Sequence, residues 1–265
     1  MTPAPKMICM AGLGYGDRVT VYIDSKRRFV VRVSPGGILG TDKGYVKHED
    51  LVGKEYGDSI VTSQKCRAYL LKPLPIDYQH GIDRVTQIVY PKDAAFMIYL
   101  AGITPGSHVL EAGVGSGFLT ISLATFIGST GKVYGFDINQ HHLEVARRNL
   151  EKAGLLDRVY LGLRDIRKGV KLVGLDAVFY DLPDPWNALK TAYNVLKNGS
   201  PILVYVPTVN QVERTVLAMR ELGGFVDIHV YELLLREYEV GKDATRPRTA
   251  MIGHTGYIVF ARKIK

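Results

Sequence analysis

Four acidic side chains stand at or near the ends of four short apolar runs. They are Glu111 in "VLEAG", Asp137 at the end of "KVYGFD", Asp165 at the end of "YLGLRD" and Asp181 at the end of "AVFYD". Such runs, rich in Val, Leu and aromatic residues, predict buried parallel strands. These four acids therefore stand at the carboxyl ends of the predicted strands, which is where ligands bind in open α/β sheets.

A glycine-rich turn follows the first of these strands. The stretch "VLEAGVGSGFLT" places Gly113, Gly115 and Gly117 between the strand and the next helix, where glycine lets the backbone approach a ligand closely. The dinucleotide fingerprint GxGxxG needs a third glycine at the position of Phe118. Asp137 follows about 20 residues later, where an acid accepts ribose hydroxyls. Loop and acid together predict a ribonucleoside ligand, and their spacing alone leaves both NAD and S-adenosylmethionine open.

The stretch "FYDLPDPW" directly after the strand that ends at Asp181 is stiff and chemically unusual. Pro183 and Pro185 exclude a helix or a paired central strand, so the chain leaves the sheet in an extended form. The loop therefore holds the Asp181 carboxylate and the Trp186 indole close to a strand tip. An alternative for Trp186 is that it only packs the loop.

Strands and helices alternate strictly from Pro91 onward. Helical patterns cover residues 91–102, 117–128, 139–154, 185–199 and 208–223, with apolar strand-like runs between them. This alternation predicts a doubly wound, Rossmann-like parallel sheet. The last two strands, "FVDIHVYELLLREYEV" and "GYIVFARKI", follow each other without a helix. They predict an antiparallel edge of the sheet.

The first part of the chain is rich in strand-forming residues. "RVTVYID" and "RRFVVRVS" are joined at Asp24-Ser25-Lys26, which predicts a hairpin, and "SIVTSQKCRAYLLKP" predicts a further strand. Two prolines and a glycine in "KPLPIDYQHG" mark the domain boundary. We expect a small β-barrel-like domain over residues 1–75 and an α/β catalytic domain over residues 76–265.

Composition limits the classes of function. The 265 residues carry a net charge of +8, which suits a polyanion such as nucleic acid, although a merely basic protein fits as well. Cys9 and Cys66 are too few for a disulfide scaffold, and the absence of any CxxC motif or Cys/His cluster predicts no metal site. No signal peptide and no ~20-residue apolar run is present, so we expect a cytoplasmic protein without a membrane partner.

Several longer motifs together resemble the tRNA (adenine-58-N1)-methyltransferase family, particularly its archaeal members. They are "TQIVYPKDAAFMI", "VLEAGVGSGFLTISLA", "GFDINQHHLEVARRNL", "DAVFYDLPDPWNAL" and "RPRTAMIGHTGYIVFARK". The resemblance implies a class I methyltransferase fold, S-adenosylmethionine as the cofactor, tRNA as the partner and a homotetramer. It also implies methylation of N1 of adenosine 58 in the T-loop, joined by adenosine 57 in some archaeal members.

The resemblance further implies a set of cofactor contacts. Asp165 lies where members of the family accept a hydrogen bond from the adenine amino group of the cofactor. His142 is an implied cofactor contact, and the alternative is that it lies on a solvated helix face. The implied contacts are Gln87, Glu111, Gly113, Gly115, Ser116, Gly117, Phe118, Leu119, Asp137, His142, Asp165 and Asp181.

The same resemblance suggests how the target base is held. Adenine N1 already bears a lone pair, so the enzyme has to position it rather than deprotonate it. We expect Asp181 to accept from N6 and to stabilise the developing charge. The flipped base needs a flat partner, for which Tyr78 and Trp186 are candidates. Arg246 and Arg248 lie in a loop that we expect to overhang the pocket and to contact tRNA. We also expect the N-terminal domain to contact tRNA.

Three other classes of function stay open on the residues alone. Another class I methyltransferase could repair isoaspartate or methylate an RNA base carbon. The latter needs a cysteine nucleophile, and Cys9 and Cys66 both precede the cofactor domain. A non-catalytic RNA-binding module and a nicotinamide oxidoreductase are the remaining alternatives. The complete glycine loop and its acids oppose the module, and Phe118 opposes the oxidoreductase.

Overall fold

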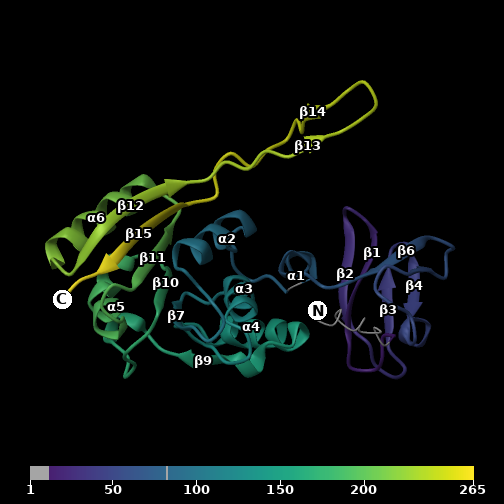
Figure 1. The fold of residues 1–265 in the computed structure, drawn as a ribbon, viewed down its shortest axis with the longest axis horizontal. Helices are drawn as coiled ribbons and strands as arrows, with labels where there is room; N and C mark the ends of the chain where they lie inside the picture. The colour runs from purple at the N-terminus through teal and green to yellow at the C-terminus, as the bar shows by residue number, and fades with distance from the viewer. Residues whose placement is uncertain (1–11, 82) are drawn as a thin grey trace, which may run out of the picture. The chain divides into compact units, whose positions relative to one another are not determined.

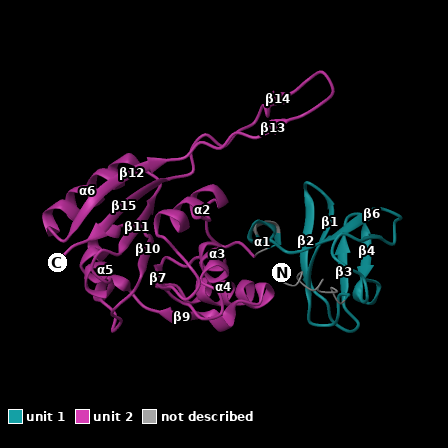
Figure 2. Cartoon of the chain, viewed as in Figure 1, with its two compact units in different colours: residues 1–82 teal, residues 83–265 magenta. Residues whose placement is uncertain are grey.

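The chain divides into two compact units, residues 1–82 and 83–265 (Figure 2). The computed structural model describes residues 12–81 and 83–265. Helix α1 (Pro75–Gly81) packs against β2 (Arg27–Arg32) and belongs to the first unit, whereas the boundary predicted from the sequence lies between residues 75 and 76. Proline at the first position of a helix lacks only an N–H that has no partner there. Of the two prolines that signalled a break, Pro75 therefore starts a helix.

The first unit is an antiparallel β structure. Its four-stranded sheet has the order β2-β1-β6-β5, and β3 and β4 form a separate hairpin. The predicted turn joins β1 to β2, and Asp24 accepts from the Lys26 amide at 2.9 Å. The described strand pairs leave β2 and β5 as sheet edges. The other strands are β1 (Arg18–Asp24), β3 (Ile38–Thr41), β4 (Gly44–Lys47), β5 (Ser59–Val61) and β6 (Arg67–Leu71).

The second unit is built on a seven-stranded sheet of the order β12-β15-β11-β10-β7-β8-β9. The five strands from β11 to β9 are parallel, and β15 runs antiparallel between β11 and β12. This confirms the predicted doubly wound sheet with an antiparallel edge. The strands are β7 (His108–Ala112), β8 (Lys132–Asp137), β9 (Val159–Leu163), β10 (Ala177–Asp181), β11 (Pro201–Val206), β12 (Phe225–Glu232) and β15 (Tyr257–Lys263).

Helices cover both faces of this sheet (Figure 1). One face carries α2 (Pro91–Leu100), α3 (Phe118–Phe126) and α4 (Gln140–Ala153). The other carries α5 (Leu189–Val195) and α6 (Val209–Leu222). The helix predicted from residue 185 opens as a short 3-10 turn, Pro185–Ala188, before α5 begins. Among the described residues, no helix combines the length and apolarity that crossing a bilayer demands.

The alternation of side chains along the strands brings three predicted acids to one face. Leu110, Val178 and Tyr180 belong to the core beneath α5 and α6. Glu111 and Asp181 therefore face α2 to α4, because neighbouring residues of a strand point to opposite faces. Asp137 joins them, since Glu111 pairs with Gly135, two residues before it on β8.

A long arm separates the last two strands. The chain leaves β12 at Glu232, forms the short pair β13 (Tyr238–Glu239) and β14 (Arg246–Pro247), and returns to β15 at Tyr257. In Figure 1 the arm projects away from the sheet of the second unit.

Candidate active site

A cavity of about 370 Å³ lies at the carboxyl ends of the parallel strands, within the second unit. This volume is typical of a site for a small molecule or cofactor. Its position is the one expected for a ligand in an open α/β sheet. The lining consists of residues 86–89, 111–116, Phe118, Leu119, 136–138, His142, 164–167 and 181–184.

The glycine loop brings backbone directly against the cavity. Gly113 has a φ of 87°, and a Cβ on it would overlap the Asp181 carbonyl, so only glycine permits this approach of β7 to β10. Gly117 has a φ of 83° and is not among the lining residues. A Cβ there would lie 3.1 Å from Cβ of Ala146. The close packing of α3 on α4 therefore explains the glycine at position 117, which the resemblance assigns to the cofactor site.

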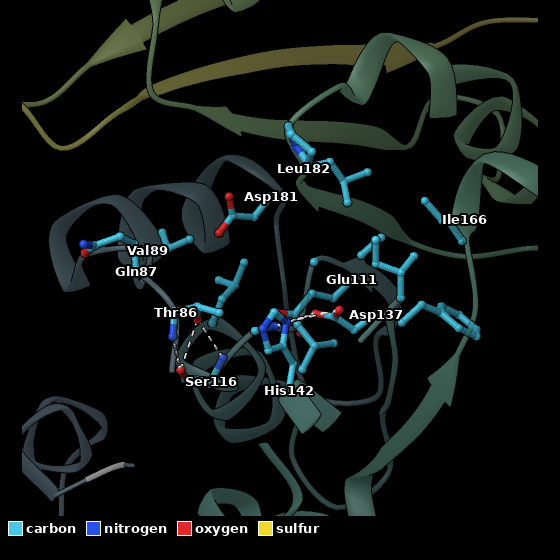
Figure 3. A pocket seen from close by; sticks show the side chains of 18 of the residues that line it. Thr86, Gln87, Val89, Glu111, Ser116, Asp137, His142, Ile166, Asp181 and Leu182 are labelled. Carbon is cyan, nitrogen blue, oxygen red and sulfur yellow. Dashed lines mark hydrogen bonds and ion pairs between the residues drawn. The ribbon is translucent and has the colours of Figure 1, made fainter. Parts of the chain in front are cut away.

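Asp137 presents a fixed carboxylate to the cavity. Its Oδ2 accepts from the Gly115 amide and its Oδ1 from the Asn139 amide, each at 2.9 Å. His142 Nδ1 lies 3.3 Å from Oδ1 (Figure 3). Each carboxylate oxygen keeps acceptor capacity beyond these bonds. The arrangement suits a ribose diol, whose two hydroxyls both donate.

Three carboxyl groups, those of Glu111, Asp137 and Asp181, face the same cavity (Figure 3). Burial, with the charges of Asp181 and Asp137 added, raises the pKa of Glu111 to about 8. Burial and the charge of Asp137 raise the pKa of Asp181 to about 7. Both side-chain oxygens of Glu111 are buried without a hydrogen-bond partner among the described residues. Such a cluster favours a cationic ligand and opposes a pyrophosphate.

Arg167 joins two sides of the cavity mouth. It holds Asp165 with Nε and Nη2 at 2.8 and 3.0 Å, and Asp184 with Nη1 at 2.8 Å. The hydrogen bonds from Arg167 keep the pKa of Asp165 below its ordinary value. Asp165 lies in the lining beside Ile166, where an acid and an apolar side chain can hold an adenine edge and face. Arg167 could not be predicted from the sequence, because an arginine in "RDIRKG" resembles one in any solvated turn.

A polar cluster anchors the segment before α2 to the glycine loop. The Ser116 hydroxyl accepts from the amides of Val85 and Thr86 at 3.0 and 3.2 Å. The Asn149 amide group donates to the carbonyls of Ser116 and Asp83. Asn149 also escaped the sequence analysis. It is fully buried on α4 between Ala146 and Leu150, and a polar residue on that apolar stripe was the available signal.

Other predicted site residues lie at different distances from the cavity. Gln87, Phe118 and Leu119 are in its lining. Trp186 is not, and instead its ring lies 4.2 Å from the Arg214 guanidinium beside a second concavity on α6. This packing matches the alternative given for Trp186. Tyr78 lies on α1 in the first unit, whereas every lining residue belongs to the second unit.

The two arginines expected over the pocket lie on the arm and not in the cavity lining. Arg248 pairs with Glu237 at 2.8 Å, and Arg246 lies 3.7 Å from Glu239. In Figure 1 the arm projects away from the sheet, and the overhang expected for these two arginines stays a prediction. Loop direction depends on what the arm packs against, which local sequence does not encode.

Both units match known protein families. Residues 67–245 match the family described as "tRNA methyltransferase complex GCD14 subunit", and residues 12–60 match the "TrmI-like N-terminal" family. A curated tRNA (adenine(57)-N(1)/adenine(58)-N(1))-methyltransferase of Methanocaldococcus jannaschii is 36% identical, over 84% of this chain and 87% of its own length. A tRNA (adenine(58)-N(1))-methyltransferase of Thermus thermophilus is 33% identical, over 90% and 94%.

Solved structures show the same fold. A SAM-dependent O-methyltransferase from Thermotoga maritima aligns with a TM-score of 0.86 and 36% identity, covering 96% of both chains. A tRNA (m1A58) methyltransferase from Aquifex aeolicus aligns with a TM-score of 0.79 and 28% identity, covering 96% of this chain and 99% of its own. These matches confirm the resemblance and the predicted fold class. The chain belongs to the tRNA methyltransferase family described by the GCD14 subunit, with a TrmI-like domain before its methyltransferase fold.

Proposed function

We propose that this protein transfers a methyl group from S-adenosylmethionine to N1 of adenosine 58 in the T-loop of tRNA, with adenosine 57 as a second target. The observation that carries this proposal is the cluster of Glu111, Asp137 and Asp181 around the glycine loop of one cavity. Its charge suits a cationic nucleoside cofactor. The relatives' names supply the substrate, and the one that is 36% identical is named for both adenosines.

The residues present fit S-adenosylmethionine, which when bound supplies an electrophilic methyl group on a sulfonium. Asp137 would hold the ribose hydroxyls, and Asp165 with Ile166 would hold the adenine. The orphaned carboxyl oxygens of Glu111 face the cavity beside Gly113 and supply acceptors for a cationic amino group. A nicotinamide dinucleotide fits poorly, because its pyrophosphate would meet these acids at the glycine loop.

Asp181 performs the protein's main chemical task in this proposal. Adenine N1 attacks with its own lone pair, so no residue has to remove a proton first. Asp181 lies in the cavity at the strand tip, where its carboxylate can accept from N6 and stabilise the ring as it becomes cationic. The close approach of Gly113 to the Asp181 carbonyl fixes the backbone there. In this proposal, the positioning of adenine N1 and the stabilisation of the developing charge accelerate methyl transfer.

The cavity also weighs against methylation of a base carbon. That reaction uses a cysteine nucleophile, and none of the lining residues is a cysteine. Cys66 lies in the first unit, and Cys9 lies outside the described residues. The base nitrogen, which needs no covalent activation, is therefore the better acceptor.

Assembly and location belong to the proposal as well. A homotetramer, implied by the family resemblance, would cover apolar side chains that the arm leaves exposed, among them Leu234, Leu235, Tyr238 and Val240. Sedimentation equilibrium would test the tetramer. The cytoplasmic location stays a prediction of the sequence. Tyr78, Arg246 and Arg248 stay proposed tRNA contacts, each tested by alanine substitution and a tRNA-binding titration.

Methyl transfer to defined tRNAs tests the function. Unmodified tRNA should accept label from methyl-labelled S-adenosylmethionine, and replacing adenosines 57 and 58 by guanosine should abolish it. A non-catalytic RNA-binding module would bind both tRNAs without labelling either. A repair enzyme would instead label an isoaspartyl peptide, and that result would overturn the proposal.

A further inference from the structure

Tyr205 stands beside Asp181 without lining the cavity. The two residues are register partners on the parallel strands β10 and β11, so their side chains leave the same face of the sheet as neighbours. Tyr205 is 6% exposed. Within the described part of the chain, the Asp181 carboxylate makes no hydrogen bond to another side chain or to the backbone. Its direction therefore depends on packing, and the Tyr205 ring is its neighbour on the next strand.

The Tyr205 hydroxyl borders a polar network that is partly buried. Asp93, at the start of α2, is fully buried, and its Oδ2 accepts from Tyr205 at 3.4 Å and from the Thr255 hydroxyl at 2.7 Å. Lys92 Nζ donates to Asp93 Oδ1 at 2.7 Å and to Thr255 Oγ1 at 2.6 Å. An ammonium can only donate, so Thr255 accepts from Lys92 and gives its single hydrogen to Asp93. The direction of the hydrogen bond from Thr255 to Asp93 is thereby fixed.

The foot of the arm, His254–Gly256, packs against Tyr205 and contributes Thr255 to this network. A Cβ on Gly256 would overlap the Tyr205 ring, so the backbone itself forms the wall behind the ring. His254 contacts two acceptors, Glu232 Oε1 at 2.7 Å and the Pro207 carbonyl at 2.8 Å. Hydrogen bonds from the His254 ring to the Glu232 carboxylate and to the Pro207 carbonyl raise the pKa of His254. A cationic ring can donate to both acceptors at once, which ties the foot to β12 and to the end of β11.

We propose that Thr255, acting with Lys92 and Asp93, is a positioning residue for methyl transfer because it fixes Tyr205 against Asp181. The inference rests on the proposed function and adds residues from α2 and from the arm's foot. These residues touch neither the cofactor cavity nor the expected cofactor contacts. We take Asp181 as a contact of the target base, so the loss of these residues should slow the transfer step and change cofactor binding little.

A pair of substitutions at Thr255 tests this in the full-length protein. Thr255→Val keeps the side-chain shape and removes the hydroxyl, whereas Thr255→Ser keeps the hydroxyl. We expect Thr255→Val to lower the single-turnover rate on tRNA about 10- to 100-fold, the scale of a displaced catalytic group. Its dissociation constants for S-adenosylhomocysteine and tRNA should stay within about twofold of wild type. Thr255→Ser should recover most of the rate.

Thr215→Val is the matched control. Thr215 is fully buried, whereas Thr255 is partly buried, and the Thr215 hydroxyl donates to the Gln211 carbonyl within α6 at 2.7 Å, away from the cavity. The Thr215→Val variant should lose stability as Thr255→Val does. Its single-turnover rate should nevertheless stay at the wild-type value when both variants are assayed well below their melting temperatures. A merely structural Thr255 would behave in the same way.

Tyr205→Phe links the two ends of the network. It removes only the hydroxyl and should be as slow as Thr255→Val, and the double variant should be no slower than either alone, because both act through one contact. Wild-type rates in Thr255→Val and Tyr205→Phe, or weakened S-adenosylhomocysteine binding in both, would overturn the positioning role while leaving the proposed function standing. An inert wild-type enzyme would overturn the proposed function, and the inference with it.

Discussion

At the scale of single residues, the proposed reaction depends most on the ionisation state of Asp181. It must be ionised to stabilise a cationic base, yet burial and the nearby Asp137 charge raise its pKa to about 7. A cation bound in the cavity favours the ionised form and lowers that pKa again. The empty site and the loaded site therefore differ in protonation, which has a measurable consequence.

We predict that kcat/KM for S-adenosylmethionine falls as the pH drops through about 7, because kcat/KM reports the free enzyme and its carboxylate is then lost. The profile should be recorded for wild type and for Asp181→Asn. The Asn variant should lack this acidic limb and be slower at every pH. A wild-type profile that stays flat across this range would contradict the role given to the Asp181 charge.

Glu111 should reveal itself in stability. Its pKa rises from an ordinary 4.5 to about 8 on folding, so between these values the folded protein binds a proton that the unfolded chain does not. The free energy of unfolding must then decrease as the pH rises across that window. Glu111→Gln should flatten the decrease and be more stable than wild type near the upper end. Urea titrations at both ends of the window measure this, and parallel curves for the two proteins would refute it.

Asp137 should control cofactor affinity. Asp137→Ala removes the acceptor for the ribose hydroxyls and should weaken S-adenosylmethionine binding by roughly 1.5–3 kcal/mol, the scale of hydrogen bonds to a charged group. Isothermal titration calorimetry gives the number, and Asp165→Ala provides a comparison at the adenine end. Unchanged affinity in Asp137→Ala would remove this residue from the site.

At the scale of elements, the sequence predicted the parts that depend on local pattern. The strand ends at Asp137 and Asp181, and the glycine loop, follow from apolar periodicity and turn chemistry, so the core of the site was predictable. Helix α1 was missed because its first residue, Pro75, signals a break and also suits a helix start. The arm's direction and the Arg167 bridge depend on contacts between distant segments, which a single sequence does not display.

Asn149 tests how the elements hold the site. Asn149→Leu removes the amide that holds the Ser116 and Asp83 carbonyls, and should lower the free energy of unfolding of the second unit by about 2–4 kcal/mol. Trp186, the only tryptophan of the chain, lies in this unit, so its fluorescence follows the transition. Asn210→Ala on the exposed side of α6 is the control and should change little. Equal midpoints for the two variants would contradict the anchoring role.

At the scale of the whole molecule, the acidic cavity contrasts with the basic chain. The net charge is +8, yet the centre of the site gathers three carboxyl groups. The two signs suit two ligands: a cationic cofactor inside and a polyanionic tRNA outside. Cofactor and tRNA binding should therefore respond differently to salt.

We predict a steep salt dependence for tRNA and almost none for S-adenosylhomocysteine. If about four phosphates are neutralised, the log–log slope of tRNA affinity against salt is about −3 to −4, depending on strand form. Fluorescence anisotropy with labelled tRNA measures the slope, and calorimetry provides the cofactor control. A flat tRNA profile would mean that the net charge does not serve this partner.

The most direct test of the account is the identity of the methylated atom. Unmodified tRNA should be incubated with the purified protein and S-adenosylmethionine, digested to nucleosides and separated by chromatography coupled to mass spectrometry. We predict N1-methyladenosine as the product, formed about 10²–10³-fold more slowly by Asp181→Ala, which is the usual effect of losing one charge-stabilising contact. A methyl group on N6 or on a carbon of adenine, on another base, or on no nucleoside at all would contradict it.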